Sequence, residues 1–212
     1  MGAISPEKLI KFKDNLNAGC KKLLLISKGG DVDTAIEMGR LVRKKMIFVA
    51  TEYKQSCASA CVFVYAGGVQ RLPNGKIEIH RPYLSSSLAS YERTQVKYRA
   101  LDDRIKKFLK EMNVNDELFN MMMAIKPEET KVLSVDEMEK LGMGQIDPVF
   151  DEYLDNAKAA TAKMSKQSWM IKKVSTKNQC GDIYRNFDNS KQAEDVLACW
   201  SRKFPQWFVE VN

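Results

Sequence analysis

The sequence lacks several features that would assign it to whole classes of protein. It has no run of about eighteen apolar residues, which excludes a transmembrane helix of ordinary length. It has one histidine, and the spacings of its five cysteines form no familiar tetrahedral set with it, so no metal site is expected. It also has no internal repeat and no low-complexity tract. With 44% hydrophobic residues among 212, the chain is long and apolar enough for a real core.

The positive charge of the chain does not have the pattern of a nucleic-acid-binding surface. The formal net charge is +7, but the excess is spread along the sequence instead of concentrated in one arm. In residues 91–112 basic and acidic side chains are interspersed, as on a solvated helix face. No base-stacking aromatics alternate with the basic residues, so we expect no nucleic-acid partner.

The most informative segment contains a serine in a turn of small residues. Residues 56–61 read Ser-Cys-Ala-Ser-Ala-Cys, and the only histidine, His80, follows Ser59 by 21 positions. A serine hydroxyl is a weak nucleophile at neutral pH and needs a base within hydrogen-bond reach, which His80 could supply. The alternative is that Ser59 caps a buried helix and His80 is an ordinary strand residue.

A glycine turn follows the first apolar strand. Residues 22–27 are a short apolar run, Gly29 and Gly30 come next, and an amphipathic stretch begins at residue 32. Paired glycines at such a junction let the backbone approach a bound group with its N–H donors free, which is the geometry of an oxyanion hole. Gly-Gly is also an ordinary turn, and that alternative stays open.

The order of these segments resembles that of a known family. Ser-Lys-Gly-Gly-Asp-Val at 27–32, Cys-Ala-Ser-Ala-Cys at 57–61 and Leu-Pro-Asn-Gly to Ile-His-Arg-Pro at 72–82 are similar to motifs of the Clp protease proteolytic subunit and its periplasmic relatives. Residues 91–112 resemble the family's long handle helix, and 133–147 resemble its closing motif. The resemblance covers about residues 4–150 and implies the α/β ClpP/crotonase-like fold, a parallel β-sheet with helical crossovers.

The resemblance also implies site residues. Ser59 corresponds to the nucleophile and His80 to the general base. The oxyanion hole would be formed by Gly29, Gly30 and Ala60, with the N–H groups of Gly30 and Ala60 as donors and Gly29 permitting the turn. No cofactor is implied.

Two positions depart from the family. Thr130, preceded by Glu128 and Glu129, stands where the family has the triad aspartate. We expect Thr130 or Glu129 beside the second ring nitrogen of His80, and slow turnover, because a neutral threonine does not offset an imidazolium charge. Lys28 replaces the family's proline and loosens the glycine turn.

These features predict a serine hydrolase of the peptidase class, with a peptide or protein substrate. The alternative is a weakly active or inactive relative that serves as an oligomeric binding scaffold, which the substitution at Thr130 favours. An acyl-CoA-handling crotonase relative is disfavoured, because those enzymes do not need a Ser/His pair. The resemblance implies a trimer-based homo-oligomer, and an apolar stripe either serves that assembly or packs on its own domain: Tyr98, Leu101, Ile105, Phe108 and Met112.

The hydrophobic pattern predicts alternating elements in a main domain, residues 1–150. Helices are expected at 6–18, 32–44, 60–66 and 91–112, and strands at 22–27, 46–51 and 76–80. Such alternation indicates parallel strands with helical crossovers. A capping box of Ser134 and Glu137 opens a last helix, which Gly142 ends.

The character of the chain changes after residue 150, and we assign residues 151–212 to a C-terminal extension. A small α+β unit is expected, with a helix at 151–165, a strand at 169–174 and a helix at 189–203. Its aromatic residues suggest docking on the main domain or on a neighbouring subunit: Trp200, Phe204, Trp207 and Phe208.

The cysteines favour an oxidising compartment. A bridge between Cys180 and Cys199 would staple the extension, whereas Cys57 and Cys61 either pair across the serine turn or stay reduced, and Cys20 is left free. We therefore expect a periplasmic or secreted bacterial protein. Because the first residues lack the basic-then-apolar layout of a signal peptide, we expect a signal segment to have been removed before residue 1.

Overall fold

The structure is a computed structural model that describes residues 2–83, 91–126, 128–144, 146–184 and 190–208. The chain divides into unit 1, Met1–Asp147, and unit 2, Pro148–Asn212. The sequence placed the corresponding boundary at residue 150. Unit 1 is mixed α/β, and all the elements in the described residues of unit 2 are helices.

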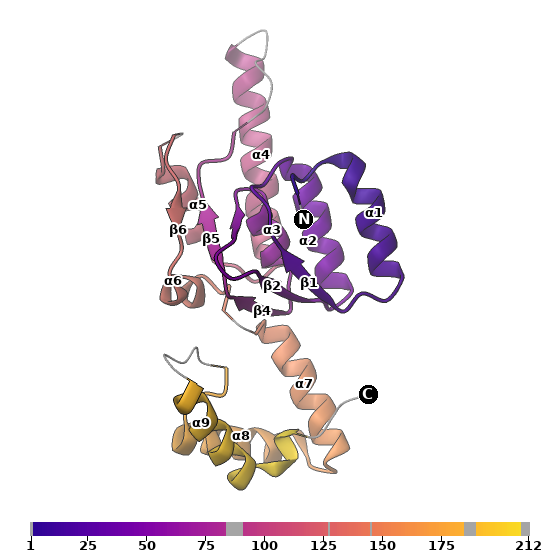
Figure 1. The fold of residues 1–212 in the computed structure, drawn as a ribbon, viewed down its shortest axis with the longest axis vertical. Coiled ribbons are helices and arrows are strands. Elements are labelled where there is room, and N and C mark those ends of the chain that lie inside the picture. Colours follow the sequence, from indigo (N-terminus) through magenta and orange to yellow (C-terminus); the bar gives the residue numbers. More distant parts are fainter. Residues whose placement is uncertain (1, 84–90, 127, 145, 185–189, 209–212) are drawn as a thin grey trace. The chain divides into compact units, whose positions relative to one another are not determined.

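Two small sheets form the centre of unit 1 (Figure 1). The first is parallel, with the order β1-β2-β4: Lys22–Leu25, Phe48–Thr51 and Gln70–Pro73. The second has the order β3-β5-β6: Ser56–Ala58, Lys76–Ile79 and Lys131–Val132. Strands β3 and β5 are parallel and β6 is antiparallel. The parallel strands and their helical crossovers confirm the predicted α/β fold.

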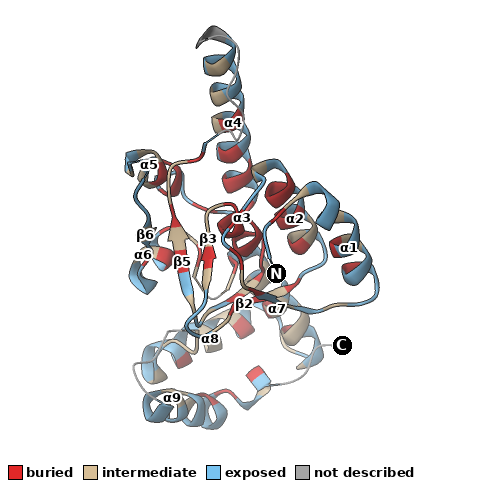
Figure 2. Cartoon of the chain, turned by 45° about the horizontal axis from the view of Figure 1, so that its top comes forward, coloured by how far each residue is buried: buried red, intermediate tan, exposed pale blue. Residues whose placement is uncertain are grey.

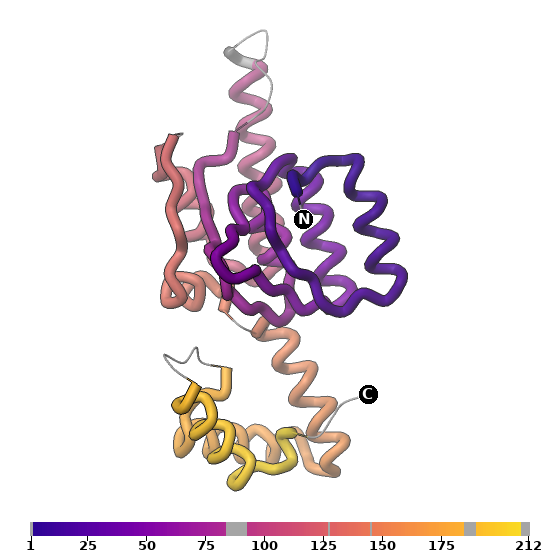
Figure 3. Tube along the Cα trace, in the orientation of Figure 1, coloured from indigo at the N-terminus to yellow at the C-terminus, as the bar shows by residue number. Residues whose placement is uncertain are grey.

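Two isolated β-bridges connect the start of the chain, the glycine turn and the strand before the serine turn. Ser27, just after β1, bridges Cys57 of β3, and Ile4 bridges Gly30. The start of the chain therefore runs beside the glycine turn, which can be followed along the indigo part of the tube in Figure 3. The glycine turn and the serine turn consequently lie side by side.

Helices surround these sheets. Those of unit 1 are α1 Pro6–Asn17, α2 Val32–Lys44, α3 Cys61–Ala66, α4 Tyr91–Glu111, α5 Glu117–Ala124 and α6 Val135–Lys140. Helix α2 begins after Asp31, whose carboxylate accepts from the Thr34 N–H at 2.8 Å, as an N-cap residue does. Helix α6 opens with the predicted capping box, and Gly142 follows it with a φ of 76°.

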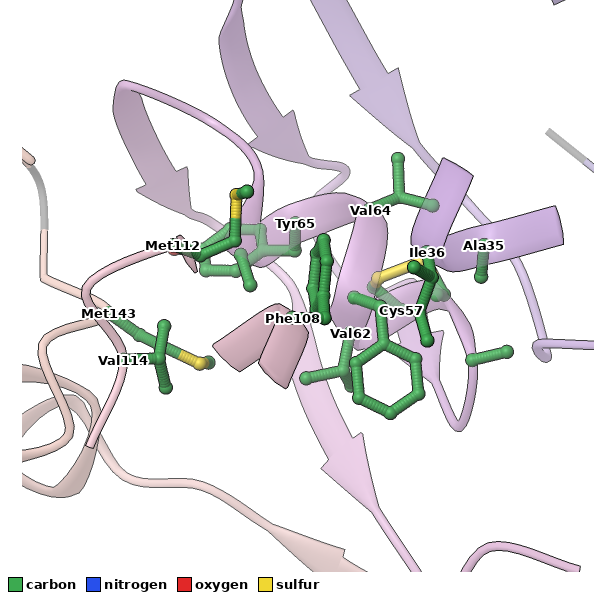
Figure 4. Close-up of a cluster of buried hydrophobic side chains, with 14 of the residues drawn as sticks. Ala35, Ile36, Cys57, Val62, Val64, Tyr65, Phe108, Met112, Val114 and Met143 are labelled. Atoms are coloured by element: carbon green, nitrogen blue, oxygen red, sulfur yellow. A yellow bond between two sulfur atoms is a disulfide. The ribbon is translucent and has the colours of Figure 1, made fainter. Parts of the chain in front are cut away.

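Helix α3 is buried on all sides. All six of its residues belong to the core, which appears red in Figure 2. It approaches α2 closely, because a Cβ on Gly67 would lie 2.2 Å from the Gly39 carbonyl oxygen. Phe63 meets Phe108 of α4 edge to face, with ring centroids 5.9 Å apart. Figure 4 shows Phe108 among the buried side chains around it. This packing fixes the start of α3, next to the serine turn.

The apolar stripe of α4 packs inside its own unit. Leu101, Ile105, Phe108 and Met112 are each at most 3% exposed and belong to the core of unit 1. Of the two alternatives for the stripe, packing on its own domain therefore holds for these four residues, because their three-four spacing turns them toward the core, whereas Tyr98 is half-buried. None of the helices in the described ranges is long and apolar enough to cross a membrane.

A buried arginine organises the last part of unit 1. Arg71 of β4 is 1% exposed and donates to the carbonyl oxygens of Gly142 and Ala66, at 3.0 Å each. The Asp147 carboxylate lies 2.7 Å from Arg43 and 3.8 Å from Arg71. Burial lowers the pKa of Arg71 to about 10, so the side chain stays charged at neutral pH.

We expect Asp147→Asn to lower the free energy of unfolding of unit 1 by about 3 kcal/mol at pH 7, because it removes a buried counter-charge. Burial by itself raises the pKa of Asp147, but the hydrogen bond and charge of Arg43 outweigh it, and the net pKa is lowered. The contribution of the carboxylate is therefore present above its unfolded pKa, about 3.9, and lost as the pH falls through the lower folded pKa.

Urea unfolding followed by circular dichroism at pH 7 and at acid pH measures this effect. The difference between wild type and variant should shrink as the pH falls below about 3.9. All three tryptophans lie in unit 2, so their fluorescence provides an internal control. An unchanged unfolding midpoint for unit 1 at pH 7 would contradict the prediction.

Unit 2 corrects one sequence-based expectation. Its elements are α7 Pro148–Thr161, α8 Lys166–Cys180, α9 Ser190–Lys203 and the 3-10 helix η1 Pro205–Phe208. The strand predicted at 169–174 is wrong, and the α+β assignment with it. Ser165 caps α8, and Trp169 is fully buried, whereas Ile171 and Val174 are 64% and 52% exposed. Two of the four apolar residues in the run that suggested a strand, Ile171 and Val174, thus face solvent on a helix.

The aromatic residues of unit 2 form its own core. Trp169, Trp200, Phe204 and Trp207 are each at most 3% exposed and cluster together. Of the residues expected to dock this unit elsewhere, Phe208 alone is substantially exposed, at 45%. The sulfur atoms of the predicted pair Cys180 and Cys199 lie at disulfide distance and join α8 to the end of α9.

Candidate active site

Ser59 lies in the turn between β3 and α3. Its backbone is left-handed, with a φ of 56°, which is uncommon for a residue with a side chain and recurs at functional sites. Its N–H donates to the Glu78 carbonyl at 2.9 Å. A sharp turn from strand to helix exposes a serine hydroxyl. Ser59 is therefore not the helix cap of the alternative interpretation, since α3 begins at Cys61 after Ala60.

The glycine turn packs directly against Ser59. Gly29 and Gly30 have φ values of 97° and 144°, which favour glycine. A Cβ on Gly29 would lie 2.6 Å from the Ser59 Cβ, and one on Gly30 would lie 2.1 Å from the Ile4 carbonyl oxygen. Only glycine fits at either position without displacing the neighbouring backbone or the serine.

Two backbone donors remain unused beside the serine. Among the described residues, the N–H groups of Gly30 and Ala60 have no hydrogen-bond acceptor. The Gly29 N–H, by contrast, donates to the Ser27 hydroxyl at 3.1 Å. Gly29 is therefore not a donor of the expected oxyanion hole, and its contribution is the close turn.

His80 follows β5 and is held through its Nδ1 atom. That nitrogen lies 2.8 Å from the Arg81 carbonyl oxygen. Because a carbonyl can only accept, Nδ1 carries the proton, and the lone pair of the neutral ring resides on Nε2. The Arg81 side chain donates to the Met123 carbonyl at 3.1 Å, and Tyr83 stacks on the imidazole at 5.6 Å. These contacts fix the ring and its tautomer.

Ser59, His80 and Gly30 line one cavity of about 360 Å³. The structure thus brings together residues that are far apart in the sequence, from the glycine turn, the serine turn and the end of β5. The Ser59 hydroxyl makes no hydrogen bond to any other described residue, His80 included, although both side chains line the cavity.

The structure does not bring Thr130 or Glu129 to this cavity. Both side chains are exposed, and Glu129 pairs with Lys126 at 3.0 Å. The Arg81 carbonyl occupies the position beside His80 Nδ1 that the sequence interpretation assigned to one of them.

Charged and aromatic residues on the cavity wall were missed at the sequence level. Asp33 and Arg104 form an ion pair at 2.7 Å across α2 and α4, and Tyr83 covers His80. Lys28 and Asp31 also line the cavity. No sequence signal singles out Arg104, because its role depends on how α4 packs against α2. No cluster of three or more potential metal ligands occurs in the part of the chain that is described.

Comparison with known proteins identifies the fold. A mutant of ClpP1 from Listeria monocytogenes is similar with a TM-score of 0.50 and 19% identity, covering 67% of this chain and 84% of that protein. A mutant of the 1510-N membrane-bound stomatin-specific protease is similar with a TM-score of 0.51 and 18% identity, covering 74% and 81%. These likenesses show a ClpP-like fold. No protein-family model and no curated protein matches the sequence.

Proposed function

We propose that the protein is a ClpP-like serine hydrolase that cleaves peptides, with Ser59 as nucleophile and His80 as general base. One observation carries the proposal: a serine in a left-handed turn, the only histidine and the glycine turn lie on one cavity. The ClpP-like fold supports it. Neither a metal ion nor a cofactor is required for this chemistry.

The reaction follows from the tautomer of His80. With Nδ1–H donating to the Arg81 carbonyl, Nε2 accepts the proton of Ser59 as Oγ attacks the peptide carbonyl carbon. The oxyanion that forms is bound by the N–H groups of Gly30 and Ala60. The imidazolium then gives its proton to the leaving amine, and an acyl-enzyme remains. A water molecule, deprotonated by His80, releases the acid and restores Ser59.

Peptide hydrolysis tests the proposal directly. Incubation with a library of unstructured peptides, analysed by mass spectrometry, should yield internal cleavage products from the wild-type protein and none from Ser59→Ala. Intact peptides in both samples, together with retained peptide binding, would support the alternative of an inactive scaffold instead.

We expect Thr130→Asp to leave the rate of peptide hydrolysis within about twofold of wild type. Thr130 is exposed and does not line the cavity, and the Arg81 carbonyl already accepts from His80 Nδ1, so a carboxylate at position 130 would find that nitrogen occupied. Steady-state kinetics of the variant and of Glu129→Gln measure the effect. A rise of tenfold or more in kcat would assign the third triad position to residue 130 after all, as the sequence suggested.

We also propose a periplasmic or secreted location and a trimer-based assembly. Two cysteine pairs at disulfide distance are compatible with an oxidising compartment. Since the α4 stripe is buried, assembly would use other surfaces. Light scattering at micromolar concentration should give the mass of a trimer, or a multiple of it, of the 24.2 kDa chain. A monomeric mass that persists at high protein concentration would exclude the assembly.

A further inference from the structure

A disulfide encloses the turn that carries Ser59. Cys57 lies in β3 and Cys61 is the first residue of α3, and their sulfur atoms are bonded across the three residues between them. Both cysteines are fully buried, with 0% exposure, so the bond itself does not touch a substrate. The enclosed segment nevertheless supplies the hydroxyl of Ser59 and the unused N–H of Ala60.

We propose that the Cys57–Cys61 disulfide is a positioning element that holds Ser59 and the Ala60 N–H in register with the glycine turn, so that hydrolysis depends on the oxidised pair. The inference rests on the proposed function of Ser59. It assigns to the two cysteines a role in the chemistry of the site, beyond the general stabilisation that a disulfide provides.

Hydrogen bonds on both sides of Ser59 also restrain its backbone, and after the serine the Val62 N–H donates to the Ser59 carbonyl at 3.0 Å. Before the serine, the Ala58 N–H donates to the Ser27 carbonyl at 2.9 Å, and the Ser59 N–H donates to Glu78 at 2.9 Å. The left-handed conformation of Ser59 is intrinsically unfavourable and persists only where its surroundings impose it. The cross-link joins the two ends of the turn and thereby opposes relaxation to an extended or right-handed conformation.

The glycine turn leaves little tolerance for such relaxation. The Ser59 Cβ, the Ala58 carbonyl oxygen and the Ala60 nitrogen all lie within 3.0 Å of the place where a Gly29 Cβ would be. A small shift of the serine turn would therefore change the distance from Oγ to His80 and the aim of the Ala60 N–H together. Misplacement of reacting groups by about 1 Å costs about a hundredfold in rate.

The second disulfide provides a matched comparison. Cys57 and Cys61 are 4 positions apart, whereas Cys180 and Cys199 are 19 apart and lie in unit 2. Loop-closure entropy grows with the length of the closed loop, so the longer bridge constrains the unfolded chain more. If the disulfides acted only on stability, removal of the longer bridge would lower the free energy of unfolding more than removal of the shorter one. A positioning role predicts instead that removal of the shorter bridge has the larger effect on activity.

The test compares Cys57→Ala/Cys61→Ala with Cys180→Ala/Cys199→Ala. We expect the rate constant for inactivation by a fluorophosphonate to fall about a hundredfold in the first variant, with the probe affinity little changed, and to stay within twofold in the second. Hydrogen–deuterium exchange should accelerate at residues 58–60 in the first variant only. This second readout requires no activity.

Reduction of the Cys180→Ala/Cys199→Ala variant, which keeps only the Cys57–Cys61 bond, repeats the test without loss of side-chain volume at the serine turn. A dithiol supplies two electrons and two protons, which convert the disulfide to two thiols while the dithiol becomes a cyclic disulfide. Because both sulfur atoms are buried, the protein is refolded in the presence of the dithiol. Labelling should fall as in Cys57→Ala/Cys61→Ala and recover on reoxidation.

The outcomes separate the two proposals. An unreactive wild-type protein would end the proposed function, whereas exchange at residues 58–60 would still show whether the disulfide orders the turn. Unchanged exchange there, or labelling of the reduced protein at the oxidised rate, would overturn the inference. Accelerated exchange spread evenly over unit 1 would also overturn it, because the bond would then support the fold and not the turn.

Discussion

Ser59→Ala is expected to remove all covalent labelling by a fluorophosphonate probe and to lower peptide hydrolysis by about ten-thousandfold or more. The hydroxyl of Ser59 lines the cavity with His80 and makes no hydrogen bond to another described residue. Without it, no other serine or threonine hydroxyl among the described residues lines the cavity. Intact mass and peptide mapping of the labelled protein locate the adduct.

Ser56 offers a matched control for this substitution. It lies three positions earlier in β3, and its hydroxyl donates to the Glu78 carboxylate at 2.6 Å instead of lining the cavity. Ser56→Ala should therefore keep labelling near the wild-type rate. Equal labelling of Ser59→Ala and wild type, or an adduct mapped to another residue, would contradict the assignment of the nucleophile.

The parts of the site that the sequence predicted are those that depend only on residues close together in the chain. The run from β1 through Gly29 and Gly30 into α2 shows its strand, turn and helix directly, because apolar periodicity and glycine act locally. The capping box of Ser134 and Glu137 is equally local, and the structure contains it. Such features need no knowledge of the tertiary packing.

Other features depend on contacts that no local pattern encodes. The Arg81 carbonyl beside His80 is a backbone atom, so the identity of residue 81 carries no signal for it. The three-four spacing on α4 is the same for a core-facing and an assembly face, and only packing against the core decides between them. In α8 the exposed Ile171 and Val174 led to the wrong prediction of a strand. β-branched residues favour strands only on average, so their presence does not decide the structure of one segment.

The site also shows why glycine is required at position 29 in particular. The residue combines a φ of 97° with a close approach to Ser59, and these two demands have different costs. A left-handed φ costs a residue with a Cβ roughly 1 kcal/mol. The close approach adds a displacement of the serine turn, which would lower the reactivity of Ser59 as well as the stability of the fold.

Gly29→Ala is accordingly expected to lower the rate of fluorophosphonate labelling by about a hundredfold, since the new methyl group would meet the Ser59 Cβ at 2.6 Å and push the hydroxyl out of register. Gly19 provides a control that has the backbone cost without the close contact. It has nearly the same φ, 93°, but no atom lies within 4 Å of the place where its Cβ would be.

Gly19→Ala should therefore lose about 1 kcal/mol of stability and keep its labelling rate. The comparison requires labelling rates and thermal unfolding of both variants at a temperature where both remain folded. If the two variants label equally fast, the contact between Gly29 and Ser59 does not position the nucleophile. If Gly29→Ala alone loses labelling while it stays folded, the glycine turn acts on the serine through that contact, because the backbone cost is common to both.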